Sequence, residues 1–207
     1  MNALLKFTAP PVVAAALVLC VAPHFDSQLR GEYPRDPKPY NGLVRQAIEK
    51  SVRWAKDGEI LRMARQAERK YGRQIQQISR LYSANPQEIK AIAIVESLLD
   101  ETAKSSEGAI GLMGVKPETA AAMGFSDVEH PLRNLSAGTK YYRMLLNRFK
   151  DRDLALAAYN LGPNKLENRL GSGFDPEEMQ YLWKIRRVVH LINRAEAQER
   201  TAGGGHS

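Results

Sequence analysis

The residue with the clearest potential for chemistry is Glu96, an acid in an otherwise apolar segment. It follows Ile89, Ile92 and Ala93 at the spacing that places these residues on one face of a helix. No lysine or arginine lies within one helical turn of it in the sequence. Its carboxyl group is therefore expected to be desolvated, paired with a distant residue, or open to a cleft. Desolvation raises the pKa of a carboxyl group and keeps its proton near neutral pH, which is what a general acid requires.

Glu96 also fits a simpler interpretation, in which it lies at a frayed helix end and points to water. Acids are rarely buried, so the helix alone favours this second interpretation. The residues that follow favour a functional role for Glu96 instead. Three glycines, Gly108, Gly111 and Gly114, lie in a short segment that is otherwise largely apolar. Such a segment suits a backbone that is folded tightly against another surface, with positive φ angles or close approach.

The elements that must position Glu96 are predicted to be helices. The helix that carries it should begin at Asn85-Pro86, because Asn85 can cap it and proline suits the first helical position. Glu88 occupies the position of a capping-box acid. A further helix is predicted to start near Pro117, directly after the glycine-rich segment.

The second half of the chain shows the same helical character. Asn134 can cap one helix, and a short helix over Asp153–Asn160 should be stopped by Gly162-Pro163. Tyr159, in the short helix, fits a core aromatic residue with a satisfied hydroxyl. The sequence contains no long run of alternating strand residues. The predicted fold class is therefore all-α, with at most a minor β-hairpin.

Several blocks of residues, taken in chain order, resemble the signature of the soluble lytic transglycosylase family. The blocks are Glu96-Ser97, Ala103-x-Ser105-x-x-Gly108-Ala109-x-Gly111-Leu112-Met113, Pro117-x-Thr119-Ala120, Pro131-x-x-Asn134-Leu135-x-Ala137-Gly138-x-x-Tyr141, Ala157-Ala158-Tyr159-Asn160-x-Gly162-Pro163 and Tyr181-x-x-Lys184-Ile185. The resemblance covers about residues 75–190. One position departs from the family pattern, since the family usually carries glutamine where this chain has Gly114.

The resemblance implies a lysozyme-like domain of goose type that cleaves the glycan strands of peptidoglycan without a metal or cofactor. Lytic transglycosylases cut between N-acetylmuramic acid and N-acetylglucosamine and leave a 1,6-anhydro-muramyl end. In this chain, Glu96 would act first as the acid and then as the base.

The resemblance also implies substrate contacts for four further residues. Ser105 would hydrogen-bond the glycan or the intermediate, and Met113 would form the cleft wall around the acid. Tyr159 would line the cleft and orient Glu96 or the sugar, with Asn160 supporting it. Ser97 fits a structural role as well as a functional one. Gly114 would remove one polar contact to the substrate.

The number of candidate carboxylates bears on the mechanism, because a hydrolytic glycosidase generally needs two acids that flank the bond. Asp100 fits a helix end that faces solvent, Glu107 lies inside the loop, and Glu118 fits the first turn of a helix. One acid suffices when a hydroxyl of the same sugar attacks the anomeric carbon, since no water is then consumed. Glu96 alone therefore fits a non-hydrolytic cleavage.

Residues 1–22 are predicted to be an export signal or a short membrane anchor. The apolar run over residues 12–22 is short for a membrane span, and Pro23 is unfavourable directly after a cleavage site. Leu19 precedes Cys20 where a lipoprotein has a small residue, so simple export is favoured over lipidation. The protein is therefore expected in the periplasm or cell envelope of a bacterium, with membrane contact through this segment only.

The remaining flanks are predicted to be extensions of the domain. Residues 23–41 read as a proline-rich linker, and residues 42–74 as a basic amphipathic helical extension of two helices or one kinked helix, with a turn signal at Asp57-Gly58. The extension can pack on the domain, bind a partner helix or lie on a membrane, and packing is the commonest explanation. Residues 191–207 are expected to be a helix end and a tail that is disordered from Thr201.

Charge and cysteine usage exclude some classes of function. The net charge is +7, and the basic excess lies in the flanks, which suits solvated helix faces or attraction to an anionic polymer or a membrane surface. Cys20 is the only cysteine, so the mature chain would have no disulfide and no thiolate metal site. The four histidines are too scattered to predict a metal site.

Three other functions are compatible with parts of the sequence. A glycan-binding or scaffold protein of the same fold is opposed by Glu96 and mildly favoured by Gly114, and a lysozyme-type hydrolase would need a second acid. A basic nucleic-acid binder is opposed by the export signal, so no nucleic-acid partner is expected. A role in an envelope-spanning secretion or conjugation machine, contacted through the basic extension, is a further hypothesis.

Overall fold

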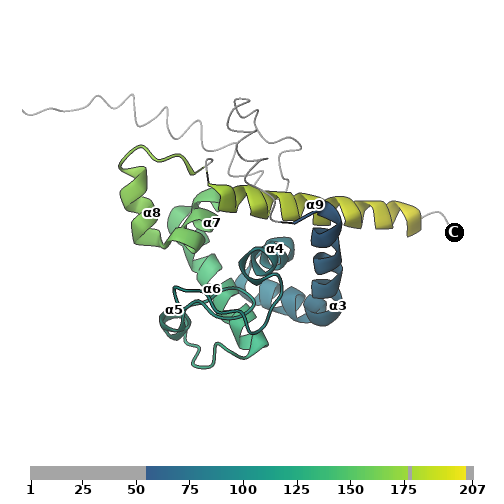
Figure 1. Ribbon diagram of the computed structural model, residues 1–207, viewed down its shortest axis with the longest axis horizontal. Helices are drawn as coiled ribbons and strands as arrows, with labels where there is room; N and C mark the ends of the chain where they lie inside the picture. The colour runs from purple at the N-terminus through teal and green to yellow at the C-terminus, as the bar shows by residue number, and fades with distance from the viewer. Residues whose placement is uncertain (1–54, 177–178, 204–207) are drawn as a thin grey trace, which may run out of the picture. The chain divides into compact units, whose positions relative to one another are not determined.

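The structure, a computed structural model, describes residues 55–176 and 179–203. The predicted export signal or anchor, the linker and residues 42–54 of the predicted extension lie outside the described residues, as do residues 204–207. The described part is all-α, as predicted. Its helices are α3 (Asp57–Tyr82), α4 (Pro86–Ser97), α5 (Pro117–Ala122), α6 (Pro131–Phe149), α7 (Arg152–Leu161), α8 (Pro163–Leu170) and α9 (Gln180–Gly203) (Figure 1).

Helix α4 lies at the centre of the described fold and packs against α3 and α9 (Figure 1). The six consecutive residues from Ile89 to Ile94 are fully or almost fully buried, and all of them except Lys90 are apolar. This helix is therefore apolar around most of its circumference, as a core helix must be. Each buried isoleucine contributes about 2 kcal/mol relative to an exposed one, so α4 is fixed firmly in place.

The predicted cap of α4 is confirmed, but the predicted role of Glu88 is wrong. The Asn85 side chain accepts a hydrogen bond from the backbone N–H of Gln87 at 2.9 Å. Glu88 is buried instead of closing a capping box. Its carboxylate accepts a hydrogen bond from the Tyr142 hydroxyl at 2.8 Å and forms an ion pair with Arg152. Glu88 thereby connects α4 to α6 and α7.

Helix α3 is continuous from Asp57 to Tyr82, and the residues before the predicted turn lie outside the described part of the chain. Asp57-Gly58, the predicted turn, lies at its start, where the Glu59 side chain accepts a hydrogen bond from the backbone N–H of Lys56 at 2.9 Å. Its buried face includes Ile60, Ala67 and Ile75, and the helix packs against α4, α6 and α9. Residues 57–74 of the predicted extension therefore belong to the helical core.

A polar cluster around Lys90 joins α3, α4 and α9. The Lys90 ammonium group is almost fully buried and pairs with Glu68 at 2.9 Å and with Glu196 at 3.3 Å. Gln87 donates to both carboxylate oxygens of Glu196 at 3.1 and 3.0 Å. A buried ammonium requires such partners, because an unpaired charge in the core is costly.

The helices of the second half differ from expectation at their ends. Helix α6 begins at Pro131, so the prediction that Asn134 caps it is wrong. Gly162 ends α7 with a φ angle of 87°, and Pro163 then occupies the first turn of α8, a helix that the local sequence pattern does not predict. Helix α9 continues to Gly203, which lies within the segment expected to be disordered.

None of the helices in the described ranges is both long enough and apolar enough to cross a membrane.

Candidate active site

Glu96 lies in the last turn of α4, where the chain leaves the core. Its side chain is half-buried. The hydroxyl of the neighbouring Ser97 is within hydrogen-bonding distance of the carbonyl oxygens of Ala93, at 3.0 Å, and Leu112, at 2.9 Å. Ser97 therefore attaches the end of α4 to the glycine-rich loop, which is a structural role.

The turn directly after Glu96 is strained. Leu98 and Leu99 have φ angles of 55° and 66°, in the left-handed region that residues with a Cβ rarely adopt. Each such residue costs about 1 kcal/mol relative to ordinary backbone. Leu99 is buried, while Leu98 is 51% exposed. The strained turn sends the chain sharply from α4 into the loop that faces Glu96.

The glycine-rich loop is folded tightly, as predicted. Gly108, Gly111 and Gly114 all have positive φ angles, of 82°, 72° and 56°. Two isolated β-bridges, between Lys104 and Ile110 and between Ile110 and Val115, are the minor strand pairing of this part of the chain. Helix α4 and this loop together form a fixed surface around the carboxyl group.

Asn134 holds the loop in place from α6. Its side chain accepts a hydrogen bond from the Met113 N–H at 2.8 Å and donates to the carbonyl oxygens of Ile110, at 2.7 Å, and Val128, at 3.0 Å. A Cβ at Gly111 would lie 2.6 Å from the Asn134 amide nitrogen, so a side chain there would displace this anchor. The family block that contains Asn134 therefore serves the loop and not a helix cap.

Gly114 lies directly against the Glu96 carboxylate. A Cβ at position 114 would be only 2.7 Å from Oε2 of Glu96, closer than real Cβ contacts allow. A glutamine at this position would have to adopt a left-handed backbone and also displace the acid. The glycine therefore does more than omit a polar contact, because it admits the carboxyl group to this position.

Burial raises the pKa of Glu96 to about 7, while the nearby Tyr181 hydroxyl and Lys184 ammonium act to lower it. Burial raises the pKa of the Tyr181 hydroxyl well above its ordinary value, and the nearby carboxylate raises it further. Both residues come from α9. Near neutral pH, Glu96 can therefore both hold and release a proton.

Tyr159 and Met113 lie beside this arrangement and support the loop. The Tyr159 hydroxyl donates to the Met113 carbonyl oxygen at 2.8 Å. Met113 is fully buried, so its side chain offers no exposed surface to a ligand in this structure. A Cβ at Gly138 of α6 would lie 2.8 Å from the Met113 sulfur and 2.9 Å from the Tyr159 hydroxyl oxygen, so only glycine admits this packing. Tyr159 thus orients the loop beneath Glu96.

The other two expected contact residues are exposed. The Ser105 hydroxyl accepts hydrogen bonds from the backbone N–H groups of Ala109 at 3.0 Å and Glu107 at 3.3 Å, which leaves its own O–H available. Asn160 is exposed in the last turn of α7. The structure does not connect either residue to Glu96 by a hydrogen bond.

Among the described carboxyl groups, Glu96 alone combines a raised pKa with access to solvent. Burial also raises the pKa of Glu88 to about 7, but this carboxyl group is inaccessible to solvent. It already accepts a hydrogen bond from Tyr142 and forms an ion pair with Arg152. Asp100 is exposed, and hydrogen bonds from Thr102 lower its pKa. Glu107 pairs with Lys116 at 3.3 Å.

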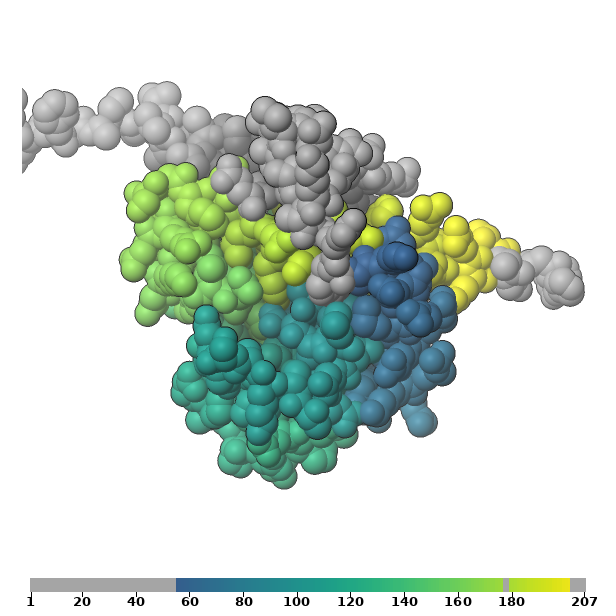
Figure 2. Space-filling view, viewed as in Figure 1, coloured from purple at the N-terminus to yellow at the C-terminus, as the bar shows by residue number. Residues whose placement is uncertain are grey.

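The loop that follows α4 contributes to the molecular surface between α8 and α3 on the face drawn in Figure 2. The described part of the chain contains no group of three or more His, Cys, Asp or Glu side chains that could hold a metal ion. What the site offers is one titratable carboxyl group, a nearby ammonium and a tyrosine hydroxyl.

The sequence alone indicates Glu96 and the loop, but it gives no role for Tyr181 or Lys184. Both residues belong to the last block of the resemblance, which was the signal that could have identified them. Their approach to Glu96 depends on how α9 packs on α4, and periodicity contains no information on that contact.

Comparison with known proteins places this geometry in a family. The family model described as transglycosylase SLT domain matches residues 73–181. Membrane-bound lytic murein transglycosylase F of Cellvibrio japonicus is 34% identical over 131 residues, which are 57% of this chain and 26% of that protein. The transglycosylase of Enterobacteria phage PRD1 is 32% identical over 111 residues, 54% of this chain and 40% of that protein. The chain thus spans less than half the length of these relatives.

Solved structures show the same fold. The 70-kDa soluble lytic transglycosylase of Escherichia coli superposes with a TM-score of 0.56 and 18% identity over 84% of this chain and 40% of that protein. An inactive mutant of lytic transglycosylase Slt from Pseudomonas aeruginosa gives a TM-score of 0.54 and 20% identity over 74% of this chain and 33% of that one. The lysozyme-like architecture expected from the sequence is therefore confirmed.

Proposed function

Because this chain belongs to the transglycosylase SLT domain family, we propose that it is a lytic transglycosylase that cleaves the glycan strands of peptidoglycan. The observation that carries the proposal is the Glu96 carboxyl group, which is half-buried against Gly114 and has a pKa raised by burial to about 7. The family membership indicates the substrate class, and this carboxyl group supplies the chemistry.

The proposed reaction uses Glu96 twice. Protonated Glu96 donates its proton to the glycosidic oxygen, and the bond between this oxygen and the anomeric carbon breaks. The resulting carboxylate then takes the proton of the 6-hydroxyl of the same muramic acid residue, whose oxygen bonds to the anomeric carbon. The product is a 1,6-anhydro end, no water is consumed, and Glu96 regains its proton. A pKa near the working pH favours both transfers.

The surroundings of Glu96 support this double role. Lys184 would stabilise the carboxylate that forms after the first proton transfer, since an opposite charge nearby favours the ionised form. The Tyr181 hydroxyl, which lies beside Glu96, would donate to the same carboxylate. No second reachable carboxyl group with a raised pKa is found in the described part, and this favours the one-acid reaction over the two-acid reaction of hydrolases.

Of the remaining site residues, two are proposed to contact the glycan and two to support the loop. Ser105 and Asn160, which are exposed, are proposed to contact the glycan directly. Tyr159 and Met113 are proposed to act through the loop, because their hydrogen bond and packing fix its backbone. We place the protein in the bacterial cell envelope, where its proposed substrate occurs. Neither the fold nor the relatives support the hypothesis of a secretion or conjugation partner.

Mass spectrometry of the products released from purified peptidoglycan tests the proposal. The parent protein should release muropeptides with 1,6-anhydro ends, and the Glu96→Gln variant should release none. Products with reducing ends would show hydrolysis and would refute the one-acid reaction. Equal activity of the parent and the variant would remove Glu96 from the mechanism.

A further inference from the structure

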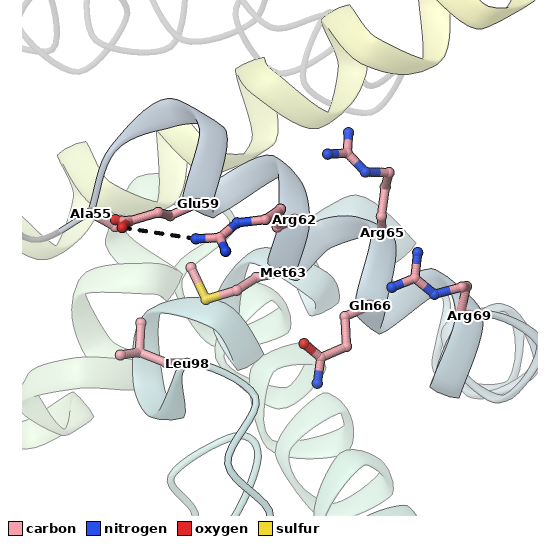
Figure 3. A pocket seen from close by; sticks show the side chains of 8 residues that line it. All are labelled: Ala55, Glu59, Arg62, Met63, Arg65, Gln66, Arg69 and Leu98. Carbon is pink, nitrogen blue, oxygen red and sulfur yellow. Dashed lines mark ion pairs between the residues drawn. The ribbon is translucent and has the colours of Figure 1, made fainter.

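A concave site lies between helix α3 and the strained turn that follows Glu96. The pocket has a volume of about 580 Å³ and is shown in Figure 3. Among the described residues, it is lined by Ala55, Glu59, Arg62, Met63, Arg65, Gln66, Arg69 and Leu98. Most of these residues precede residue 73, where the match to the family model begins. The pocket is therefore built largely outside the segment that relates this chain to its family.

The pocket is strongly basic. Arg62, Arg65 and Arg69 come from successive turns of α3, and the only acid in the lining is Glu59. Arg62 and Glu59 are 3.9 Å apart and mostly exposed, so their ion pair is weak. Arg65 and Arg69 make no hydrogen bond or ion pair with any other described residue. Their guanidinium groups are therefore available for an anionic ligand.

The floor of the pocket has an apolar part. Figure 3 shows the Met63 side chain directed toward Leu98, with the arginine side chains along α3. Leu98 is 51% exposed although it is a large apolar residue. Its left-handed backbone, with a φ angle of 55°, costs free energy and holds the side chain in this exposed position.

The pocket lies close to the backbone that carries the candidate acid. Leu98 follows Glu96 by two residues, so their Cα atoms are at most about 7 Å apart. A ligand that fills the pocket and extends past Leu98 is therefore close enough to be part of the same substrate. This ligand must carry carboxylates for the arginines and small apolar groups for Met63 and Leu98.

We propose that this pocket binds the acidic peptide attached to the glycan strand that Glu96 cleaves. The inference rests on the proposed function, because the peptide reaches the pocket as part of peptidoglycan. Such peptides combine carboxylate groups with small apolar side chains, and a guanidinium fork suits carboxylates in two-bond geometry. The pocket would thus distinguish strands that carry peptides from strands that lack them.

Direct binding of a free peptide tests the proposal without any cleavage. The probe is the soluble peptide released from peptidoglycan by an amidase, titrated calorimetrically into the full chain. We expect the doubly substituted variant Arg65→Gln/Arg69→Gln to bind it about tenfold more weakly, as the loss of two exposed carboxylate contacts implies. The same peptide with its carboxylates converted to amides should bind the parent as weakly.

A charge-matched control separates the pocket from general electrostatics. Arg73→Gln/Arg80→Gln removes the same charge from α3 at residues that do not line the pocket, and it should bind the peptide like the parent. An equal loss in both variants would reflect net charge and would overturn the proposal. Equal binding of the native and amidated peptides would also overturn it.

Cleavage assays then distinguish failure of this inference from failure of the proposed function. On peptide-bearing peptidoglycan, Arg65→Gln/Arg69→Gln should raise KM about tenfold, and on strands stripped of peptide it should match the parent. Peptide binding without any cleavage by the parent would refute the proposed function and leave the pocket assignment standing. Cleavage by the parent without peptide binding would refute the pocket assignment alone.

Discussion

At the scale of single residues, the protonation state of Glu96 sets the pH range in which the proposed reaction can run. The first step requires the acid form, and burial raises the pKa of this group to about 7. We therefore expect kcat/KM to fall by about tenfold per pH unit above that value. A pH profile between 5 and 9 on purified glycan strands measures this, and a profile that stays flat through pH 8 would exclude Glu96 as the acid.

The same pKa shift predicts a stability cost at high pH. The folded state binds the Glu96 proton more tightly than the unfolded chain, whose carboxyl has the ordinary value of 4.5. The contribution of the protonated Glu96 to the stability of the fold is therefore fully present below pH 4.5. It is lost as the pH rises through about 7. Glu96→Gln should increase the free energy of unfolding by about 1–3 kcal/mol at pH 8 and by much less at pH 5. Urea unfolding at both pH values checks the difference, and equal effects would contradict it.

Gly114 gives a prediction with a matched control. Gly114→Ala and Gly114→Gln should lower activity by about tenfold or more, because the new Cβ would lie 2.7 Å from Glu96 Oε2 and move the acid. Gly108 has a similar positive φ angle of 82° but open space around it. Gly108→Ala should therefore lose about 1 kcal/mol of stability with activity retained. Similar loss of activity in all three variants would show that backbone strain, and not contact with Glu96, is responsible.

At the scale of elements, α6 holds the loop through one side chain. Asn134→Ala removes the acceptor of the buried Met113 N–H and the donor to two carbonyl oxygens. We expect it to destabilise the fold by about 2–3 kcal/mol and to lower kcat. Thermal unfolding and product formation measure the two effects, with the exposed Asn147→Ala on the same helix as the control. Unchanged stability in Asn134→Ala would show that the loop does not depend on this anchor.

Sequence periodicity predicted the helices better than their ends. The cap of α4 and the short helix α7 follow from local residues, since Asn85 and Asp151 accept hydrogen bonds from their own first turns. Asn134 satisfied the same local rule, yet its side chain is used by a loop that comes earlier in the chain. Gly162-Pro163 predicts the end of a helix, although a proline in the first turn can equally start one. These differences arise because tertiary contacts decide between locally equivalent choices.

At the scale of the whole molecule, the helices that surround Glu96 are held together partly by one buried charge. Lys90→Ala removes the ammonium that joins Glu68 and Glu196, and it leaves a cavity in α4. We expect a loss of about 2–4 kcal/mol in stability, measured by chemical denaturation. Lys104→Ala breaks the exposed pair with Glu129, which is 3.1 Å long, and should cost less than about 1 kcal/mol. Equal costs would contradict a structural role for the buried pair.

The candidate site could be predicted only in part because it is assembled from distant elements. Glu96 and the loop lie close together in the sequence, so the sequence alone predicts that they belong to one site. Tyr181 and Lys184 reach Glu96 from α9, and the contact depends on the packing of α9 against α4. The tight approach of Gly114 to the acid likewise depends on the folded loop. The residue types therefore indicate that Glu96 can act as an acid, while the packing of distant elements determines which groups lie near its carboxyl and shift its pKa.

Helix α3 shows that the start of the family match and the start of the folded domain are different positions in the chain. The family match begins at residue 73, in the middle of a helix of 26 residues. The half before that position supplies Ile60, Ala67 and Tyr71 to the core. A fragment that began at residue 73 would expose the apolar surfaces of α4 and α9 that these residues cover. The stretch that this protein shares with its relatives is therefore shorter than the stretch that has to fold as one.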